Sequence, residues 1–145
     1  MITIRRLTSD DAGQLERVAD GVFDQPLDAA LTAEFLADPR HHLVAAIEDG
    51  MVIGMATGFH YMHPDKPAEL FINEVGVAAS HRRRGIARGL VGALLEHGRA
   101  LGCREAWVLT EPANAAARDL YAGLDRGSVS AALMFSYSLA PIDSR

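Results

Sequence analysis

A glutamate interrupts an apolar, β-branched run in the middle of the chain. Glu74 lies between Leu70 and Val77, in a run whose composition predicts a buried strand. An unpaired carboxylate is costly in an apolar setting, so we expect Glu74 to face a wet cleft or a cationic partner. There it could serve as a general base and bind a cationic substrate. A structural carboxylate with no part in chemistry is the alternative interpretation.

Other side chains offer related chemistry. Glu111 follows the next predicted strand and is the second candidate base, because the carboxyl ends of parallel strands line the cleft of an α/β sheet. His63 is a candidate substrate-side auxiliary base. The six histidines show no metal-ligand spacing, so we expect no metal. The single cysteine, Cys103, is interpreted as small core filler and not as a catalytic thiol.

A basic turn follows the glutamate strand. Arg82, Arg83 and Arg84 precede Gly85 and Ala87, and an apolar pattern at helical spacing then runs to Leu101. A strand that turns sharply into a helix exposes backbone N–H groups at the positive end of the helix dipole, which favours a polyanion such as a pyrophosphate. The alternative is an ordinary connection with a solvated arginine cluster. The chain has neither a Walker loop nor a dinucleotide Gly-x-Gly-x-x-Gly motif.

The pattern Arg82-x-x-Gly85-x-Ala87 after a strand resembles the acetyl-coenzyme A loop of the GCN5-related N-acetyltransferases. A second signature of that family is matched downstream by four residues: Asn114, Ala117, Leu120 and Tyr121. The resemblance covers roughly residues 70–124. It implies acetyl-coenzyme A as cofactor and a mixed α/β (α+β) fold, with a central, mostly antiparallel sheet, one splayed parallel strand pair and flanking helices.

The resemblance also implies roles for residues. A backbone N–H near Val75 to Val77, at a strand bulge with which Gly76 is consistent, would polarise the thioester carbonyl. Tyr121 would act as general acid for the departing thiolate, and a half-buried helix tyrosine without a catalytic role is the alternative. The implied cofactor-binding residues are Val75, Val77, Arg82, Arg83, Arg84, Gly85, Ala87 and Asn114.

The remaining patterns predict the elements that position these groups. Strands are expected over 2–6, 42–48, 51–61, 70–77, 105–109 and 131–139, with a tight hairpin turn at Asp49-Gly50. Helices are expected from the cap signals at 8–11 to Ala19, over about 27–36, up to Leu101 with Gly102 as C-cap, and from Pro112 onward. The strand, helix and parallel strand from residue 70 to residue 109 form a right-handed βαβ unit.

Length and charge limit the function classes. The 145 residues fit one domain, expected to be cytoplasmic, with no membrane segment or signal peptide. Residues 1–74 contain 13 acidic and 5 basic residues, whereas residues 75–145 contain 6 acidic and 9 basic ones. The acidic half suits a cationic partner and the basic half an anionic cofactor, although chance surface charge would also give this asymmetry. The basic residues gather in one turn without aromatic neighbours, which argues against nucleic-acid binding.

Within the family, the layout is most similar to the aminoglycoside 3-N-acetyltransferase branch, whose members confer antibiotic resistance. Carboxylates of the Asp20, Asp24 and Asp28 series, with Glu74, could pair with substrate ammonium groups. Polyamines, protein lysines and protein N-termini would suit the same charge, and a non-catalytic acyl-coenzyme A module is a further alternative. The stretch after Tyr121 lacks the Leu-Gly-Phe of many members, and homodimer formation is left open.

Overall fold

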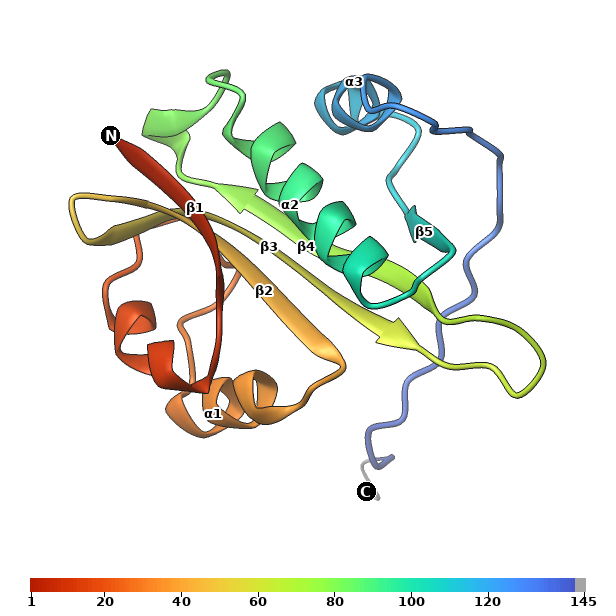
Figure 1. Cartoon of the computed structure of the whole chain (residues 1–145), viewed down its shortest axis with the longest axis horizontal. Helices are drawn as coiled ribbons and strands as arrows, with labels where there is room; N and C mark the ends of the chain where they lie inside the picture. The colour runs from red at the N-terminus through yellow and green to blue at the C-terminus, as the bar shows by residue number, and fades with distance from the viewer. Residues whose placement is uncertain (143–145) are drawn as a thin grey trace.

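The computed structural model describes residues 1–142, which form one five-stranded sheet with helical segments on both faces (Figure 1). The strands lie in chain order, antiparallel except for the parallel pair β4–β5. The elements are β1 (Ile2–Leu7), η1 (Ser9–Glu16), α1 (Ala29–Ala37), β2 (His41–Glu48), β3 (Met51–Tyr61), β4 (Glu69–Val77), η2 (Ala79–His81), α2 (Ile86–Ala100), β5 (Glu105–Val108) and α3 (Ala115–Ala122). This arrangement confirms the expected mixed, mostly antiparallel sheet with one parallel pair.

Helix α2 packs directly onto β3, as Figure 1 shows. A Cβ atom at Gly54 would lie 3.1 Å from Leu90 Cδ1, and one at Gly58 would lie 3.2 Å from Leu94 Cδ2. Leu90 and Leu94 are fully buried, so the two glycines let the helix approach the strand closely. Burial of these leucines contributes roughly 2 to 3 kcal/mol each.

The opposite face of the sheet is covered by the segment between η1 and α1. Gly76 of β4 pairs with Met55 and thus faces away from α2, and a Cβ atom at Gly76 would lie 2.1 Å from the carbonyl oxygen of Val22. Gly76 therefore accommodates a crossing backbone and not a bulge. The bulge lies at Asn73, because Glu74 pairs with Thr57 and Ile72 with Gly58. The expected bulge position at Gly76 was wrong.

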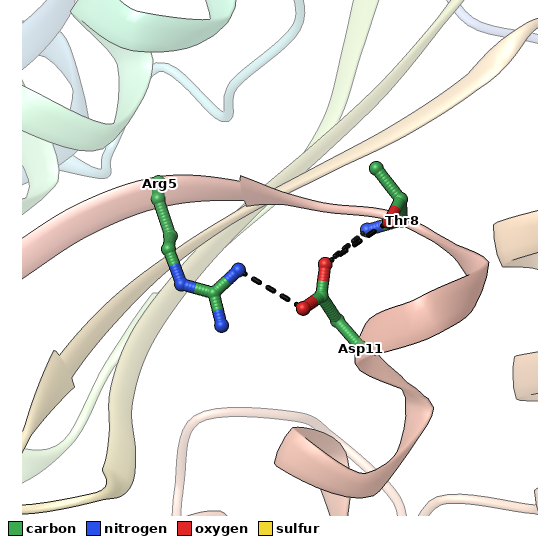
Figure 2. A network of polar contacts seen from close by, with 3 residues as sticks. All are labelled: Arg5, Thr8 and Asp11. Carbon is green, nitrogen blue, oxygen red and sulfur yellow. Dashed lines mark hydrogen bonds and ion pairs between the residues drawn. The ribbon is translucent and has the colours of Figure 1, made fainter.

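A hydrogen-bonded corner joins β1 to η1 (Figure 2). Asp11 Oδ2 accepts the Thr8 N–H at 2.8 Å, and Asp11 Oδ1 accepts from Arg5 Nη1 at 3.1 Å. The backbone hydrogen bond from Thr8 is the main reason that the pKa of Asp11 lies below its ordinary value. Thr8 is thus a cap, as the sequence indicates, but it begins a 3-10 helix that ends at Glu16.

The helix predicted to reach Ala19 stops early because the backbone of residues 17–19 forms hydrogen bonds with β3. Val52 N–H donates to the carbonyl of Arg17 at 2.8 Å, and Ala19 N–H donates to the carbonyl of Val52 at 2.9 Å. These two bonds form a parallel bridge between Val18 and Val52. Residues 17–19 therefore extend the sheet locally instead of continuing the helix.

Two turn predictions are confirmed and one helix start is wrong. Asp49 and Gly50 have φ of 52° and 77°, the left-handed pair of a tight hairpin. Gly102, with φ of 85°, ends α2, and Cys103 N–H bonds back to the carbonyl of Gly98. Helix α3 begins after Asn114 and not at Pro112, because the Asn114 side chain caps it. Within residues 1–142, no helix is both long and apolar enough to cross a bilayer.

Residues 131–139 do not form the predicted strand. A strand requires a neighbouring backbone to satisfy its N–H and C=O groups, and this segment pairs with no other strand among the described residues. The chain instead leaves α3 and runs past the β5 side of the sheet (Figure 1). Its large apolar side chains are exposed.

Three histidines form a chain of rings between the sheet and α2. His42 Nε2 lies 2.8 Å from His60 Nδ1, and His97 Nε2 lies 3.2 Å from His42 Nδ1. His42 is 3% exposed. Burial lowers the pKa of His42 from 6.5 to about 4, with further lowering by His97, His60 and Arg6.

The buried His42 predicts a stability that falls in acid. Because its pKa is lowered in the folded protein, its contribution is fully present above pH 6.5 and is lost as the pH falls toward 4. The loss between pH 7 and pH 4.5 should reach about 2 to 3 kcal/mol. Urea unfolding should show a smaller pH dependence for His42→Gln than for the wild type. An equal dependence would show that His42 is not the responsible group.

Candidate active site

The parallel strands β4 and β5 pair along only the first half of β4. Their pairing ends at Ile72 and Val108, whereas β4 continues to Val77. The edge of residues 73–77 that would face β5 thus has no strand beside it among residues 1–142. Unpaired edge amides are ready donors for a ligand carbonyl. Val75 and Val77, the two predicted cofactor contacts on β4, lie in this open stretch.

The turn after β4 presents a row of backbone donors. Arg83 and Gly85 have φ of 63° and 77°, a backbone path of the kind that makes anion-binding concavities. The amides of residues 83–88 have no backbone acceptor in the described part of the chain. They include the first N–H groups of α2, at the positive end of its dipole.

This turn fits a pyrophosphate-bearing cofactor. The space that a Cβ atom of Gly85 would fill is open, with no protein atom within 4 Å. The side chains of Arg83 and Arg84 are exposed beside it, while Arg82 Nε donates to the carbonyl of Val77 at 3.3 Å. The Arg82 side chain is therefore bound to the end of β4. The side chains of Arg83 and Arg84 remain available to an anion.

A pair that the sequence did not predict anchors the turn to the sheet. His81 Nε2 lies 2.8 Å from Glu48 Oε1 at the end of β2, and His81 Nδ1 lies 2.8 Å from Ser80 Oγ. The hydrogen bond from His81 holds the pKa of Glu48 below its ordinary value. No local pattern signals a contact between residues 33 positions apart.

Asn114 and Tyr121 lie at the two ends of α3. Asn114 Oδ1 accepts the Ala117 N–H at 3.0 Å, which leaves its amide N–H groups for a ligand. Tyr121 is half-buried, and burial raises the pKa of its phenol, which stays protonated at neutral pH. Arg88 of α2 donates to the carbonyl of Gly123 and so ties the end of α3 to the helix that begins at the basic turn.

Two candidate bases lie where the parallel strands separate. Glu74 is exposed and stands two residues beyond the last β4 residue paired with β5. Glu111, also exposed, stands three residues beyond Val108. Both therefore adjoin the opening between the strands.

His63 is not brought to this opening. Its Nε2 lies 2.5 Å from Glu69 Oε2, at the start of β4. Glu69 is five residues from Glu74, about 17 Å along a strand. The pairing with Glu69 holds His63 at the other end of β4 from Glu74, and its predicted role on the substrate side stays a prediction.

An acidic cavity of about 710 Å³ is lined by residues of η1, of the segment that follows it and of the first turn of α1. Glu16, Asp20 and Asp24 are among its lining residues. The same segment contains Val22, whose carbonyl touches Gly76 two residues from Glu74. Asp28 caps α1 by accepting the Leu31 N–H at 2.8 Å, so of the predicted aspartate series only Asp20 and Asp24 line the cavity.

Burial raises the pKa of the Cys103 thiol, which packs against the core. A raised pKa disfavours the reactive thiolate. Cys103 is thus placed as the predicted filler residue.

Comparison with known proteins identifies relatives over most of the chain. Residues 5–124 match the model of the acetyltransferase (GNAT) family. The N-alpha-acetyltransferase RimI of Mycobacterium tuberculosis is 32% identical over 100 residues, which span 68% of this chain and 63% of that protein. An L-2,4-diaminobutyric acid acetyltransferase of Oceanobacillus iheyensis is 30% identical over 84% of this chain and 68% of its own length. The chain thus spans roughly two thirds of these curated relatives.

Solved structures share the fold. The aminoglycoside acetyltransferase meta-AAC0020 from an uncultured soil metagenomic sample, in complex with sisomicin, superposes with a TM-score of 0.84 at 18% identity, covering 96% of this chain and 97% of that one. AAC(6′)-Iy in complex with a bisubstrate analogue gives 0.77 at 22% identity, covering 95% and 99%. The family match over residues 5–124, together with this fold, shows that the chain belongs to the acetyltransferase (GNAT) family.

Proposed function

We propose that this protein is an acetyl-coenzyme A-dependent N-acetyltransferase that acetylates a primary amine of a cationic small molecule, an aminoglycoside at its 3-amino group. One observation carries the proposal: the open edge of β4 leads directly into the amide-rich turn at the start of α2. A pantetheine arm requires extended hydrogen bonding, and a pyrophosphate requires converging donors. The open edge of β4 supplies the first, and the turn that follows it supplies the second.

The bound cofactor supplies the acetyl thioester. The amides of the turn, with Arg83 and Arg84, would hold the phosphates. The open edge at Val75 and Val77 would orient the thioester and donate to its carbonyl oxygen. Asn114 donates its side-chain amide to the pantetheine arm. The protonated phenol of Tyr121 gives its proton to the leaving sulfur.

Glu74 accepts the proton of the attacking amine. Its exposure beside the strand opening suits this role, since an ammonium group must lose a proton before its nitrogen can attack. Glu111, across the same opening, is the second candidate. The amine would then attack the bound thioester directly, coenzyme A would leave as the thiol protonated by Tyr121, and no residue of the chain would carry the acetyl group.

The acceptor site is the acidic cavity. Carboxylates of Glu16, Asp20 and Asp24 attract ammonium groups, and the contact between Val22 and Gly76 places this segment against the catalytic strand. An aminosugar carries several ammonium groups, which matches several carboxylates. The sisomicin complex of a protein with the same fold supports this substrate class. Attack at the 3-amino group follows the sequence resemblance described above.

A thiol-release screen tests the function. We expect acetyl-coenzyme A to be consumed with aminoglycosides such as gentamicin or sisomicin, and turnover to fall at high salt because screening weakens charge attraction. Product NMR should place the acetyl group on the 3-amino nitrogen. Faster turnover of polyamines, diamino acids or peptide N-termini would overturn the aminoglycoside assignment, and binding without turnover of any amine would overturn the enzyme.

The acidic cavity should set the acceptor KM. In the same assay Asp24→Asn should raise the KM for the cationic acceptor about twofold to fivefold, as expected for loss of one exposed charge pair. The matched control is Asp65→Asn, which removes a carboxylate 73% exposed beside Lys66. Equal KM values for both variants would place the acceptor elsewhere.

Gly85 should matter for cofactor binding beyond its effect on folding. Gly85 and Gly102 both have positive φ and open space around a Cβ, so alanine at either should cost about 1 kcal/mol of stability. Only Gly85→Ala should also weaken coenzyme A binding, by about tenfold in Kd. Isothermal titration and thermal unfolding of both variants measure the two effects. A similar Kd for the two variants would contradict the proposed phosphate site.

Tyr121 should affect turnover and not cofactor affinity. We expect Tyr121→Phe to lower kcat by about a hundredfold, because the proton for the leaving thiolate is lost while the ring keeps its packing. The Kd for coenzyme A should stay within about twofold of the wild-type value. Activity assays give kcat, and isothermal titration with coenzyme A gives Kd. Loss of affinity without loss of kcat would assign the tyrosine to binding.

A further inference from the structure

The basic turn contains a strained residue at the place where its amides face outward. Arg83 has φ of 63°, a left-handed conformation that is unfavourable for a residue with a side chain. Such a conformation persists only where the surrounding structure holds it. The amides of residues 83–88 have no backbone acceptor among residues 1–142, so hydrogen bonds within the turn do not supply that support. A contact from outside the turn must contribute.

That contact comes from the residue just before the turn. His81 Nε2 lies 2.8 Å from Glu48 Oε1, and the two side chains are 15% and 27% exposed. In the described part of the chain, this is the only hydrogen bond that joins residues 79–85 to an element other than the flanking β4 and α2. Glu48 is itself fixed, because it pairs with Ile2 of β1 and with Met51 of β3. The turn is therefore linked to a paired part of the sheet.

The protonation of the pair gives this hydrogen bond a direction. The hydrogen bond from His81, together with the charge of Arg84, holds the pKa of Glu48 below its ordinary value. Glu48 is thus an ionised carboxylate at neutral pH and can only accept, so His81 Nε2 carries the hydrogen and donates it. In the neutral ring Nδ1 accepts, and the Ser80 hydroxyl lies 2.8 Å away as its donor. Both ring nitrogens have a partner, which fixes the orientation of the ring.

We propose that His81 and Glu48 are positioning residues for the cofactor: their hydrogen bond holds residues 82–85 in the conformation that presents the turn amides to the pyrophosphate. This inference rests on the proposed function, and both residues act through the turn. A turn that already has its binding conformation loses little affinity to ordering when the ligand arrives. Without the hydrogen bond, the turn would adopt other conformations, and the apparent Kd would rise as the competent fraction falls.

A second histidine–glutamate pair provides a matched control for cofactor affinity. His63 Nε2 lies 2.5 Å from Glu69 Oε2, and both side chains are 19% exposed. The chemistry and the exposure of this pair are similar to those of His81 and Glu48. It lies at the start of β4, however, whereas the basic turn follows the end of that strand. Its loss should therefore cost comparable stability without affecting the turn.

Isothermal titration with coenzyme A tests the inference. His81→Ala should raise the Kd about tenfold, as expected if the unsupported turn is competent about a tenth of the time. His63→Ala should have a Kd within about twofold of the wild-type value, with a similar fall in Tm. Equal Kd values for the two variants overturn the inference while the proposed function stands. A wild type without measurable affinity for coenzyme A overturns the proposed function, and this inference with it.

A double-mutant cycle tests whether the two side chains act as one unit. Glu48→Ala should also weaken binding, and the double variant should bind no more weakly than His81→Ala alone. His81→Gln, whose amide can still donate to Glu48, should recover most of the lost affinity. The KM for acetyl-coenzyme A should rise with Kd in the alanine variants, and kcat at saturation should stay within about twofold of the wild-type value. Additive losses, or a glutamine variant as weak as His81→Ala, overturn the hydrogen bond as the positioning contact. Glu48→Ala removes the same bond and so decides the question if His81→Ala fails to fold.

Discussion

The unequal length of two parallel strands determines most of what this structure presents to a ligand. Strand β5 has four residues beside the nine of β4, so the second half of β4 has a backbone edge without a neighbour. A polar backbone edge inside a folded domain is costly unless a partner satisfies it. Glu74, Glu111 and the basic turn all follow the point at which the two strands stop pairing.

Small residues make the framework around that opening possible. Gly54 and Gly58 let α2 approach β3, and Gly76 lets the backbone at Val22 cross β4. The first contact fixes the helix whose N-terminus carries the turn. The second brings the acidic segment against β4. Both contacts require glycine, because a Cβ atom would occupy the space that the neighbouring group fills. Small residues therefore allow these elements to pack closely.

Much of this arrangement could be predicted from the sequence, because local signals were strong. The apolar periodicity of α2, the Asp49-Gly50 turn and the Gly85 turn each depend on neighbouring residues, and the structure has all three. Long-range contacts were missed. The pairing of His81 with Glu48 and the crossing of Val22 over Gly76 leave no local pattern. The helix predicted to reach Ala19 failed for the same reason, since a bridge to Val52 competes for its backbone.

The side chain of Arg88 links helix α2 to the end of helix α3. Arg88 lies in the first turn of α2, one residue after Ala87, and its side chain grips the carbonyl that ends α3. Because of this hydrogen bond, the position of α3 and of its Tyr121 is linked to that of the helix that begins at the basic turn. Under the proposed function, an anion bound at the basic turn would therefore also order the helix that carries Tyr121.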